Sequence, residues 1–238
     1  MGGAVMHHPF HTLTIKKEFL MTDTEFKYRP QSLKDYVFPC KEVEEVAKAY
    51  ASGNVTRPLI LSGANGAGKS LLASLIPYEI ESEVPQINWI RSCDLNSNKE
   101  IDGHFARNKQ FDYLFTANNQ RYNYYIIEEV NFEAKASDAF RVILDDYRGI
   151  DLVIMTTNEI GKVDKGVRSR CEIVNVPACK PDIFFPFALS IIEAEGYEID
   201  EGELMSALMA VYKIRPDNRL YYQKMDELLR KASMIQGA

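Results

Sequence analysis

The chain has 238 residues, of which 46% are hydrophobic and 26% charged, with a formal net charge of -6. This composition allows one large globular domain, or a medium domain with a small one. The net negative charge excludes a basic field over the whole surface, so nucleic-acid binding would need a local patch. No apolar run is long enough to span a membrane, and we expect no membrane partner.

The cysteines and the first residues restrict the cellular setting. None of the four cysteines forms a C-x-x-C pair, so we expect reduced thiols and a cytoplasmic protein. Residues 1–22 lack the long apolar core of a signal peptide and are expected to be a disordered leader. A metal site at the three histidines of this leader is the disfavoured alternative, because only one short tract would carry it.

In chain order, strand patterns alternate with helix patterns as far as Pro177. The predicted helices are 41–53, a segment beginning at 68, and 137–148, the last capped by Ser137; the predicted strands are 57–63, 85–93, 122–130, 151–158 and 171–177. Continuous apolar strands that alternate with helices are typical of an α/β fold with a parallel sheet covered on both faces.

After Pro177 the pattern becomes purely helical. Three amphipathic segments, 181–197, 200–213 and 217–234, follow with no strand between them. We therefore predict a core domain at 23–178 and a small three-helix lid at 179–238.

The segment "GANGAGKS" fits the pattern G-x-x-x-x-G-K-[ST] through Gly63, Gly68, Lys69 and Ser70. Glycines let main-chain N–H groups turn inward around an anion, and the helix that follows adds its N-terminal dipole. Lys69 is expected to reach the β- and γ-phosphates of ATP, and the Ser70 hydroxyl to bind Mg²⁺. The predicted nucleotide contacts are Gly63, Ala64, Asn65, Gly66, Ala67, Gly68, Lys69, Ser70 and Leu71.

Hydrolysis of a triphosphate also needs a carboxylate for Mg²⁺ and a group that activates water. Glu128 and Glu129 end the apolar strand "YNYYIIEEV", and Asn158 ends "DLVIMTTN". In a parallel sheet these ends lie on the same edge as the glycine loop. We predict Glu128 as the Mg²⁺ carboxylate, Glu129 as the group that orients or deprotonates the attacking water, and Asn158 as a group that holds that water or the γ-phosphate.

These motifs, with several others in the same order, resemble the AAA+ ATPases, and within them the clamp-loader subunits. The similar segments are "FKYRPQSLKDYVFP" (26–39), the glycine loop, "CDLNSNKEID" (93–102), "EEVN", "TTN", "RSRCEIVNVP" and "RPDNRLYYQKMDEL", and together they span about residues 26 to 230. The resemblance implies an AAA+ core with a five-stranded parallel sheet, followed by the helical lid.

The resemblance also implies further roles for single residues. Arg170 of the S-R-C motif would act as an arginine finger in the ATP site of a neighbouring subunit, and Arg219 would touch the γ-phosphate in its own chain. Tyr28, Arg29 and Pro30 would lie near the adenine. The residues expected to contact phosphates of primer–template DNA are Arg107, Lys109 and Arg141.

Two departures from the family matter. The family usually has Asp where this chain has Glu128, which moves that carboxylate by about one carbon–carbon bond and bears on the Mg²⁺ geometry. Clamp-loader subunits also continue into a helical collar domain, which we do not find before Ala238.

The predicted function is that of a DNA-stimulated ATPase that loads a sliding clamp together with other AAA+ subunits. The first alternative is a helicase loader or another replication-initiation ATPase. The second is a structural subunit that binds nucleotide and contributes Arg170 to an active neighbour.

Overall fold

A computed structural model describes residues 23–236 except 96, 98, 102, 106–119, 132–133 and 147–148. Its centre is a five-stranded parallel sheet with the strand order β2-β3-β4-β1-β5. The strands are β1 (Leu59–Ser62), β2 (Ile87–Arg91), β3 (Asn123–Glu128), β4 (Asp151–Thr157) and β5 (Glu172–Asn175). The predicted fold class and all five predicted strands are confirmed.

The central strands explain the unbroken apolar runs in the sequence. Every residue of β1 and β4 is buried, because both strands have a neighbour on each side and helices over each face. In the register of the sheet, Ser62 lies beside Thr157, and Ile127 beside Met155. The carboxyl ends of β1, β3 and β4 therefore meet at one edge.

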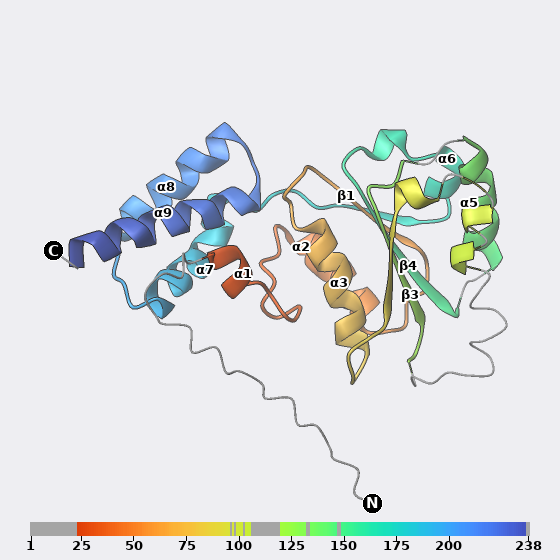
Figure 1. Cartoon of the computed structure of the whole chain (residues 1–238), viewed down its shortest axis with the longest axis horizontal. Coiled ribbons are helices and arrows are strands. Elements are labelled where there is room, and N and C mark those ends of the chain that lie inside the picture. Colours follow the sequence, from red (N-terminus) through yellow and green to blue (C-terminus); the bar gives the residue numbers. More distant parts are fainter. Residues whose placement is uncertain are drawn as a thin grey trace, which may run out of the picture.

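Two helical layers cover the sheet (Figure 1). Helices α2 (Lys41–Ala51) and α3 (Lys69–Ile80) pack on one face and enclose the first apolar core. Helices α5 (Ala134–Asp146) and α6 (Lys165–Arg168) lie on the opposite face over a second core. Short 3₁₀ turns, η1 (Ser92–Asp94) and η2 (Ile160–Lys162), follow β2 and β4.

One predicted helix start is wrong. Helix α5 begins at Ala134, three residues before the predicted cap Ser137. Ser137 is buried inside the helix, so it does not occupy the cap position, from which a side chain accepts a hydrogen bond from the first turn.

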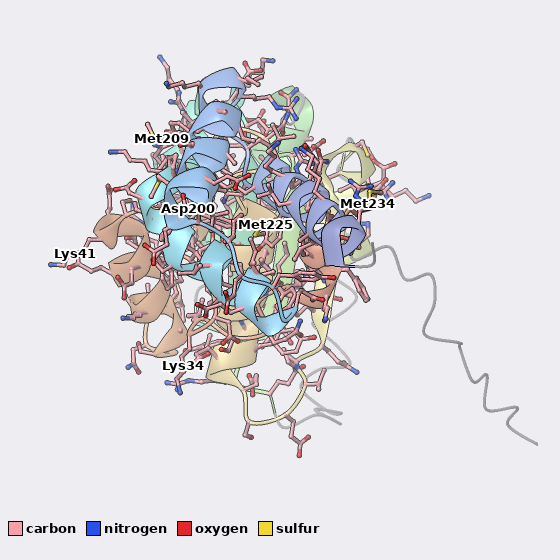
Figure 2. All side chains as sticks on the ribbon, turned by 90° about the vertical axis from the view of Figure 1, so that its left-hand side faces the viewer. Lys34, Lys41, Asp200, Met209, Met225 and Met234 are labelled. Atoms are coloured by element: carbon pink, nitrogen blue, oxygen red, sulfur yellow. The ribbon has the colours of Figure 1, made fainter. Side chains whose placement is uncertain are left out.

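Helices α7 (Pro181–Ala194), α8 (Glu201–Ile214) and α9 (Asn218–Gln236) form a bundle beside the sheet, in agreement with the three predicted helical segments. The bundle has its own core, which includes Met225, whereas Met209 and Met234 are exposed on its outside (Figure 2). Asp200 caps α8 by accepting a hydrogen bond from the Glu203 N–H. The assignment of 179–238 as a separate lid remains a prediction.

The short helix α1 (Thr24–Lys27) packs against this bundle and not against the sheet. The Thr24 N–H donates to Asp226 at 3.1 Å, and the Thr24 hydroxyl donates to the Tyr222 carbonyl at 3.2 Å. The first described residues of the chain thus contact α9, the last helix of the bundle. Among the helices of the described residues, none has the length and apolar character needed to cross a membrane.

Candidate functional site

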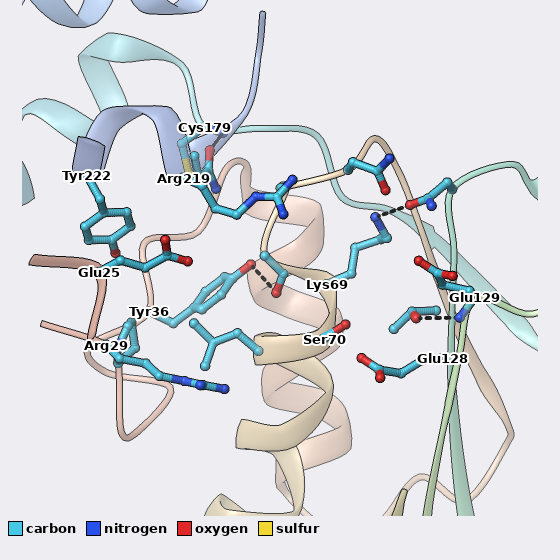
Figure 3. A pocket seen from close by; sticks show the side chains of 18 of the residues that line it. Glu25, Arg29, Tyr36, Lys69, Ser70, Glu128, Glu129, Cys179, Arg219 and Tyr222 are labelled. Carbon is cyan, nitrogen blue, oxygen red and sulfur yellow. Dashed lines mark hydrogen bonds between the residues drawn. The ribbon is translucent and has the colours of Figure 1, made fainter. Parts of the chain in front are cut away.

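A cavity of about 1100 Å³ opens between the carboxyl edge of the sheet and the helical bundle. One end, which we call the polar end, is lined by Lys69, Ser70, Glu128, Glu129 and Asn158. The opposite end, the aromatic end, is lined by Phe26, Tyr36, Phe184 and Tyr222. Figure 3 shows Tyr36 and Tyr222 on one side of α3 and the two glutamates on the other, with Lys69 between them.

The glycine loop has the backbone geometry that its sequence predicts. Gly66 and Gly68 have φ angles of +75° and +89°, in the left-handed region that side chains other than glycine rarely adopt. Gly68 immediately precedes α3, so the first amides of that helix point into the cavity end where Lys69 lies. A side chain at Gly66 would also overlap the carboxylate of Asp217.

Lys69 places a buried ammonium at the centre of the loop. Its side chain is largely withdrawn from solvent, and its Nζ donates to the Gly63 carbonyl at 2.8 Å and the Ala64 carbonyl at 2.7 Å. A third bond, of 3.0 Å, goes to Asn158 Oδ1 at the end of β4. Burial lowers the pKa of Lys69 and the Arg219 guanidinium lowers it further, although Glu129 acts in the opposite direction. An anion in the loop would relieve this unfavourable burial.

The carboxylates of Glu128 and Glu129 line the same end of the cavity as the Ser70 hydroxyl. They occupy the end of β3, as predicted, and β3 lies next to β4, which carries Asn158. The structure therefore brings together five predicted residues from three separate segments of the sequence.

Arg219 lines the cavity at the start of α9 and is bound to a buried carboxylate. Its Nε and Nη2 donate to the two oxygens of Asp217 at 3.1 and 3.0 Å. Asp217 is only 2% exposed, and burial alone would raise its pKa, but the hydrogen bonds and charge of Arg219, together with the charge of Arg215, lower it. Sequence analysis missed Asp217, although its position one residue before a helix is typical of a cap.

The start of α9 is also hydrogen-bonded to the glycine loop. The Asn218 N–H donates to the Gly66 carbonyl at 3.1 Å, and its side-chain amide donates to the Ala67 carbonyl at 3.4 Å. The Asn218 side-chain oxygen accepts from the Cys179 N–H at 2.8 Å. One residue thus ties the loop both to α9 and to the segment that leads into α7.

The aromatic end was not predicted as a set. Tyr222 and Phe184 pack edge to face, with ring centroids 5.6 Å apart, and Phe26 is 81% exposed beside them. Arg29 and Pro30 line the cavity as predicted. Tyr28 does not line it: its hydroxyl donates to Glu195 at 2.6 Å and its ring packs on the bundle.

Some predicted nucleotide contacts lie behind the cavity wall. Among the loop residues, Asn65, Gly66, Gly68 and Leu71 line the cavity together with Lys69 and Ser70. Gly63 and Ala64 contribute the carbonyls that bind Lys69, whereas Ala67 is fully buried in the first core.

The structure describes only one of the three predicted DNA contacts. Arg107 and Lys109 lie outside the described residues. Arg141 is bound to Asp164 at 2.9 Å and Asp138 at 2.8 Å, so two carboxylates already neutralise its charge. A phosphate bound by Arg141 would have to displace these carboxylates, and the DNA contact remains a prediction.

Arg170 does not line the cavity; it lies between α6 and β5. Its guanidinium binds Asp145 at 2.7 Å and the Gly166 carbonyl at 2.8 Å. An arginine so placed does not act on the cavity of its own chain.

The residues present fit a nucleotide with Mg²⁺. A buried ammonium and inward-facing amides suit phosphates, and an elongated aromatic end suits a base. No group of three or more His, Cys, Asp or Glu residues able to hold a metal occurs within the described parts of the chain. Ser70 and Glu128 would therefore hold Mg²⁺ only together with the phosphates, as is common for this ion.

No protein-family model matches the chain, but curated proteins are similar to it over most of its length. DNA polymerase III subunit gamma of Buchnera aphidicola is 24% identical over 195 residues, covering 75% of this chain and 54% of the relative. The sliding-clamp-loader large subunit of Enterobacteria phage T4 is 22% identical over 222 residues, covering 90% and 66%. Replication factor C small subunit 1 of Pyrobaculum arsenaticum is 24% identical, covering 76% and 58%.

Among solved structures, a mutant of RuvB from Thermotoga maritima superposes with a TM-score of 0.64 at 14% identity, covering 87% of this chain and 68% of that one. The chain has the AAA+ P-loop fold. It is similar to clamp-loader subunits over most of its length, and it spans roughly half to two thirds of the curated relatives described above.

Proposed function

We propose that this protein binds ATP with Mg²⁺ in the cavity and hydrolyses it as one subunit of a clamp-loader-type assembly. The observation that carries the proposal is the polar end, where the Lys69 ammonium, the Ser70 hydroxyl, two carboxylates and Asn158 converge at the mouth of a glycine loop. The name of one relative, a sliding-clamp-loader large subunit, supports the assembly, and the proposed task is to load a sliding clamp on primer–template DNA.

Each group at the polar end has a distinct chemical task. The loop amides and Lys69 bind the phosphates, and Ser70 with Glu128 holds Mg²⁺, which when bound supplies positive charge against the phosphate oxygens. Glu129 accepts the proton of the attacking water. Asn158 is released from Lys69 when the phosphates take the ammonium, which leaves its amide free to hold that water.

Arg219 would move from Asp217 toward the terminal phosphate of its own chain. The Asp217 carboxylate and the terminal phosphate are both anions and compete for Arg219, so nucleotide binding would weaken the contact between Arg219 and Asp217. Arg170 would act in the site of a neighbouring subunit, where an arginine stabilises the charge that develops on the transferred phosphoryl group. To do so it must leave Asp145, so subunit contact would open this ion pair.

The remaining partners are other AAA+ subunits, a sliding clamp and primer–template DNA. Arg107 and Lys109 are the proposed DNA contacts, and the cytoplasm or nucleoid, including that of a phage-infected host, is the proposed location. A subunit that binds nucleotide without hydrolysing it remains the second candidate, because Glu128 stands where the family usually has Asp.

The test measures ATP binding and turnover of the wild type, Glu129→Gln and Lys69→Ala, with and without primer–template DNA and a candidate clamp. We expect wild-type turnover stimulated by DNA and clamp, and ATP binding without turnover in Glu129→Gln. Wild-type binding with no turnover under any condition would favour the structural subunit. Stimulation by a hexameric helicase and not by the clamp would favour a helicase loader.

The position of Arg170 is tested by mixing two inactive variants. Arg170→Ala retains its own loop, and Lys69→Ala retains its own finger, so a mixture should contain some interfaces with both groups intact. Recovery of part of the activity on mixing is expected. No recovery at any ratio would place Arg170 outside the catalytic interface.

A further inference from the structure

Glu129 has an unusual backbone. Its φ angle of +55° is the only positive value outside glycine among the described residues. A side chain in this region costs on the order of 1–3 kcal/mol, so the surrounding structure must hold it there. The conformation turns the chain sharply just after β3 and aims the Glu129 carboxylate into the cavity.

Three successive amides after β3 are held by hydrogen bonds. The Glu129 N–H donates to Thr156 Oγ1 at 3.3 Å, and the Val130 N–H donates to the Thr156 carbonyl at 2.8 Å. The Asn131 N–H then donates to the Ser92 hydroxyl at 3.0 Å. Thr156 therefore accepts two of the three bonds, and the bond from the strained residue Glu129 goes to its hydroxyl.

The surroundings of Thr156 keep its side chain in a fixed position. It is 3% exposed, it belongs to the central strand β4, and it lies two residues before Asn158, which binds Lys69. The end of β4 thus touches the glycine loop through Asn158 and the acidic turn through Thr156. A side chain this buried has little freedom to rotate, so its hydroxyl is a rigid acceptor.

We propose that Thr156 is a positioning residue. Its hydroxyl keeps Glu129 in the left-handed conformation and so aims the Glu129 carboxylate at the attacking water. The inference rests on the proposed function of the cavity as an ATPase site. Thr156 itself does not exchange a proton with the substrate; it acts through the Glu129 N–H.

The decisive variant is Thr156→Val, which keeps the shape of the side chain and removes the acceptor. We expect kcat for ATP hydrolysis to fall by about 10- to 100-fold because the base is misplaced, while the Kd for ATP stays within about twofold. Thr156→Ser restores the hydroxyl and should keep kcat within about threefold of the wild type.

Thr157→Val is the matched control. Thr157 is the next residue of the same strand and is 4% exposed. Its hydroxyl donates to the Val130 carbonyl at 3.3 Å and accepts from the Glu159 N–H at 3.2 Å, and it makes no hydrogen bond with Glu129. It makes the same chemical change at the same depth. Equal kcat values in Thr156→Val and Thr157→Val would overturn the proposal.

A second measurement does not depend on turnover. Amide hydrogen exchange read by NMR should become at least about 10-fold faster at Glu129 in Thr156→Val, and remain near the wild-type rate in Thr156→Ser and Thr157→Val. Unchanged exchange in Thr156→Val would refute the hydrogen bond that the proposal needs. If the wild type binds no ATP, the proposed function fails, yet this exchange measurement still decides whether Thr156 holds Glu129.

Discussion

The two ends of the cavity are built in different ways. Each residue of the polar end ends or follows a strand, or starts a helix, in a recognisable local pattern, and the parallel sheet then brings these ends to one edge. The aromatic end is assembled from α1, α7, α9 and the segment before α2, which only tertiary packing brings together. A site that depends on local backbone geometry can therefore be predicted from the sequence, whereas a surface assembled from distant side chains cannot.

The largest expected effect concerns the polar end. Lys69→Ala removes the ammonium from the loop, and we expect ATP affinity to fall by about 10- to 100-fold, the usual cost of losing a hydrogen bond to a charged group. Calorimetric titration with ATP and Mg²⁺ measures it. Lys48→Ala is the control, because Lys48 is an exposed lysine of α2 paired with Glu44. Unchanged affinity in Lys69→Ala would separate the glycine loop from ATP binding.

The junction between the two ends gives the second prediction. Gly66→Ala forces a side chain into a φ of +75° and against the Asp217 carboxylate, so we expect a loss of about 1–3 kcal/mol in the free energy of unfolding and weaker ATP binding. Gly161→Ala is the control, since no atom lies within 4 Å of its added carbon. Urea unfolding compares them; equal stability would mean that the start of α9 does not press on the loop.

The third prediction concerns the aromatic end alone. Phe26→Ala removes an exposed ring, so it should leave the melting temperature unchanged, but it should weaken ATP binding by up to about 10-fold if the ring stacks on the base. Inorganic triphosphate, which has no base, should bind both proteins equally. The same loss for triphosphate would show that Phe26 acts indirectly, and no loss for ATP would remove Phe26 from the base site.

The contrast also explains which predictions from the sequence were confirmed. The five strands were predictable because apolar runs bounded by glycine or polar residues mark buried parallel strands. The convergence of Lys69, Glu128 and Asn158 followed from strand direction alone. The roles assigned to these residues remain predictions.

The unpredicted features depend on contacts between distant parts of the chain. The docking of Thr24 on Tyr222 joins residues 198 positions apart, and no periodic pattern marks it. Asp217 was overlooked because a cap residue gives no sign of the arginine or glycine it will contact. The left-handed backbone of Glu129 could not be predicted from the sequence for a different reason. Only glycine, and to a lesser extent Asn or Asp, indicates such a conformation.

The smallest expected effect tests the link between the two ends through Asp217. Burial would raise the pKa of Asp217, but the hydrogen bonds and charge of Arg219, together with the charge of Arg215, lower it below the ordinary value of 3.8. A carboxyl with a depressed folded-state pKa stabilises the fold above the unfolded value, and that contribution disappears as the pH falls through the folded-state pKa. Asp217→Asn keeps a cap but loses the charge. It should cost about 0.5–1 kcal/mol at pH 7, a modest figure because the Arg219 side chain is half exposed.

The difference between Asp217→Asn and the wild type should therefore shrink as the pH falls below 3.8, and urea unfolding at a series of pH values measures it. Asp200→Asn makes the same change at the cap of α8, where the carboxylate accepts from the Glu203 N–H instead of an arginine. If the cost of Asp217→Asn stayed constant down to the lowest pH, the ion pair would contribute nothing. The start of α9 would then hold the loop through Asn218 alone, and Arg219 would be free to meet a phosphate without first giving up a partner.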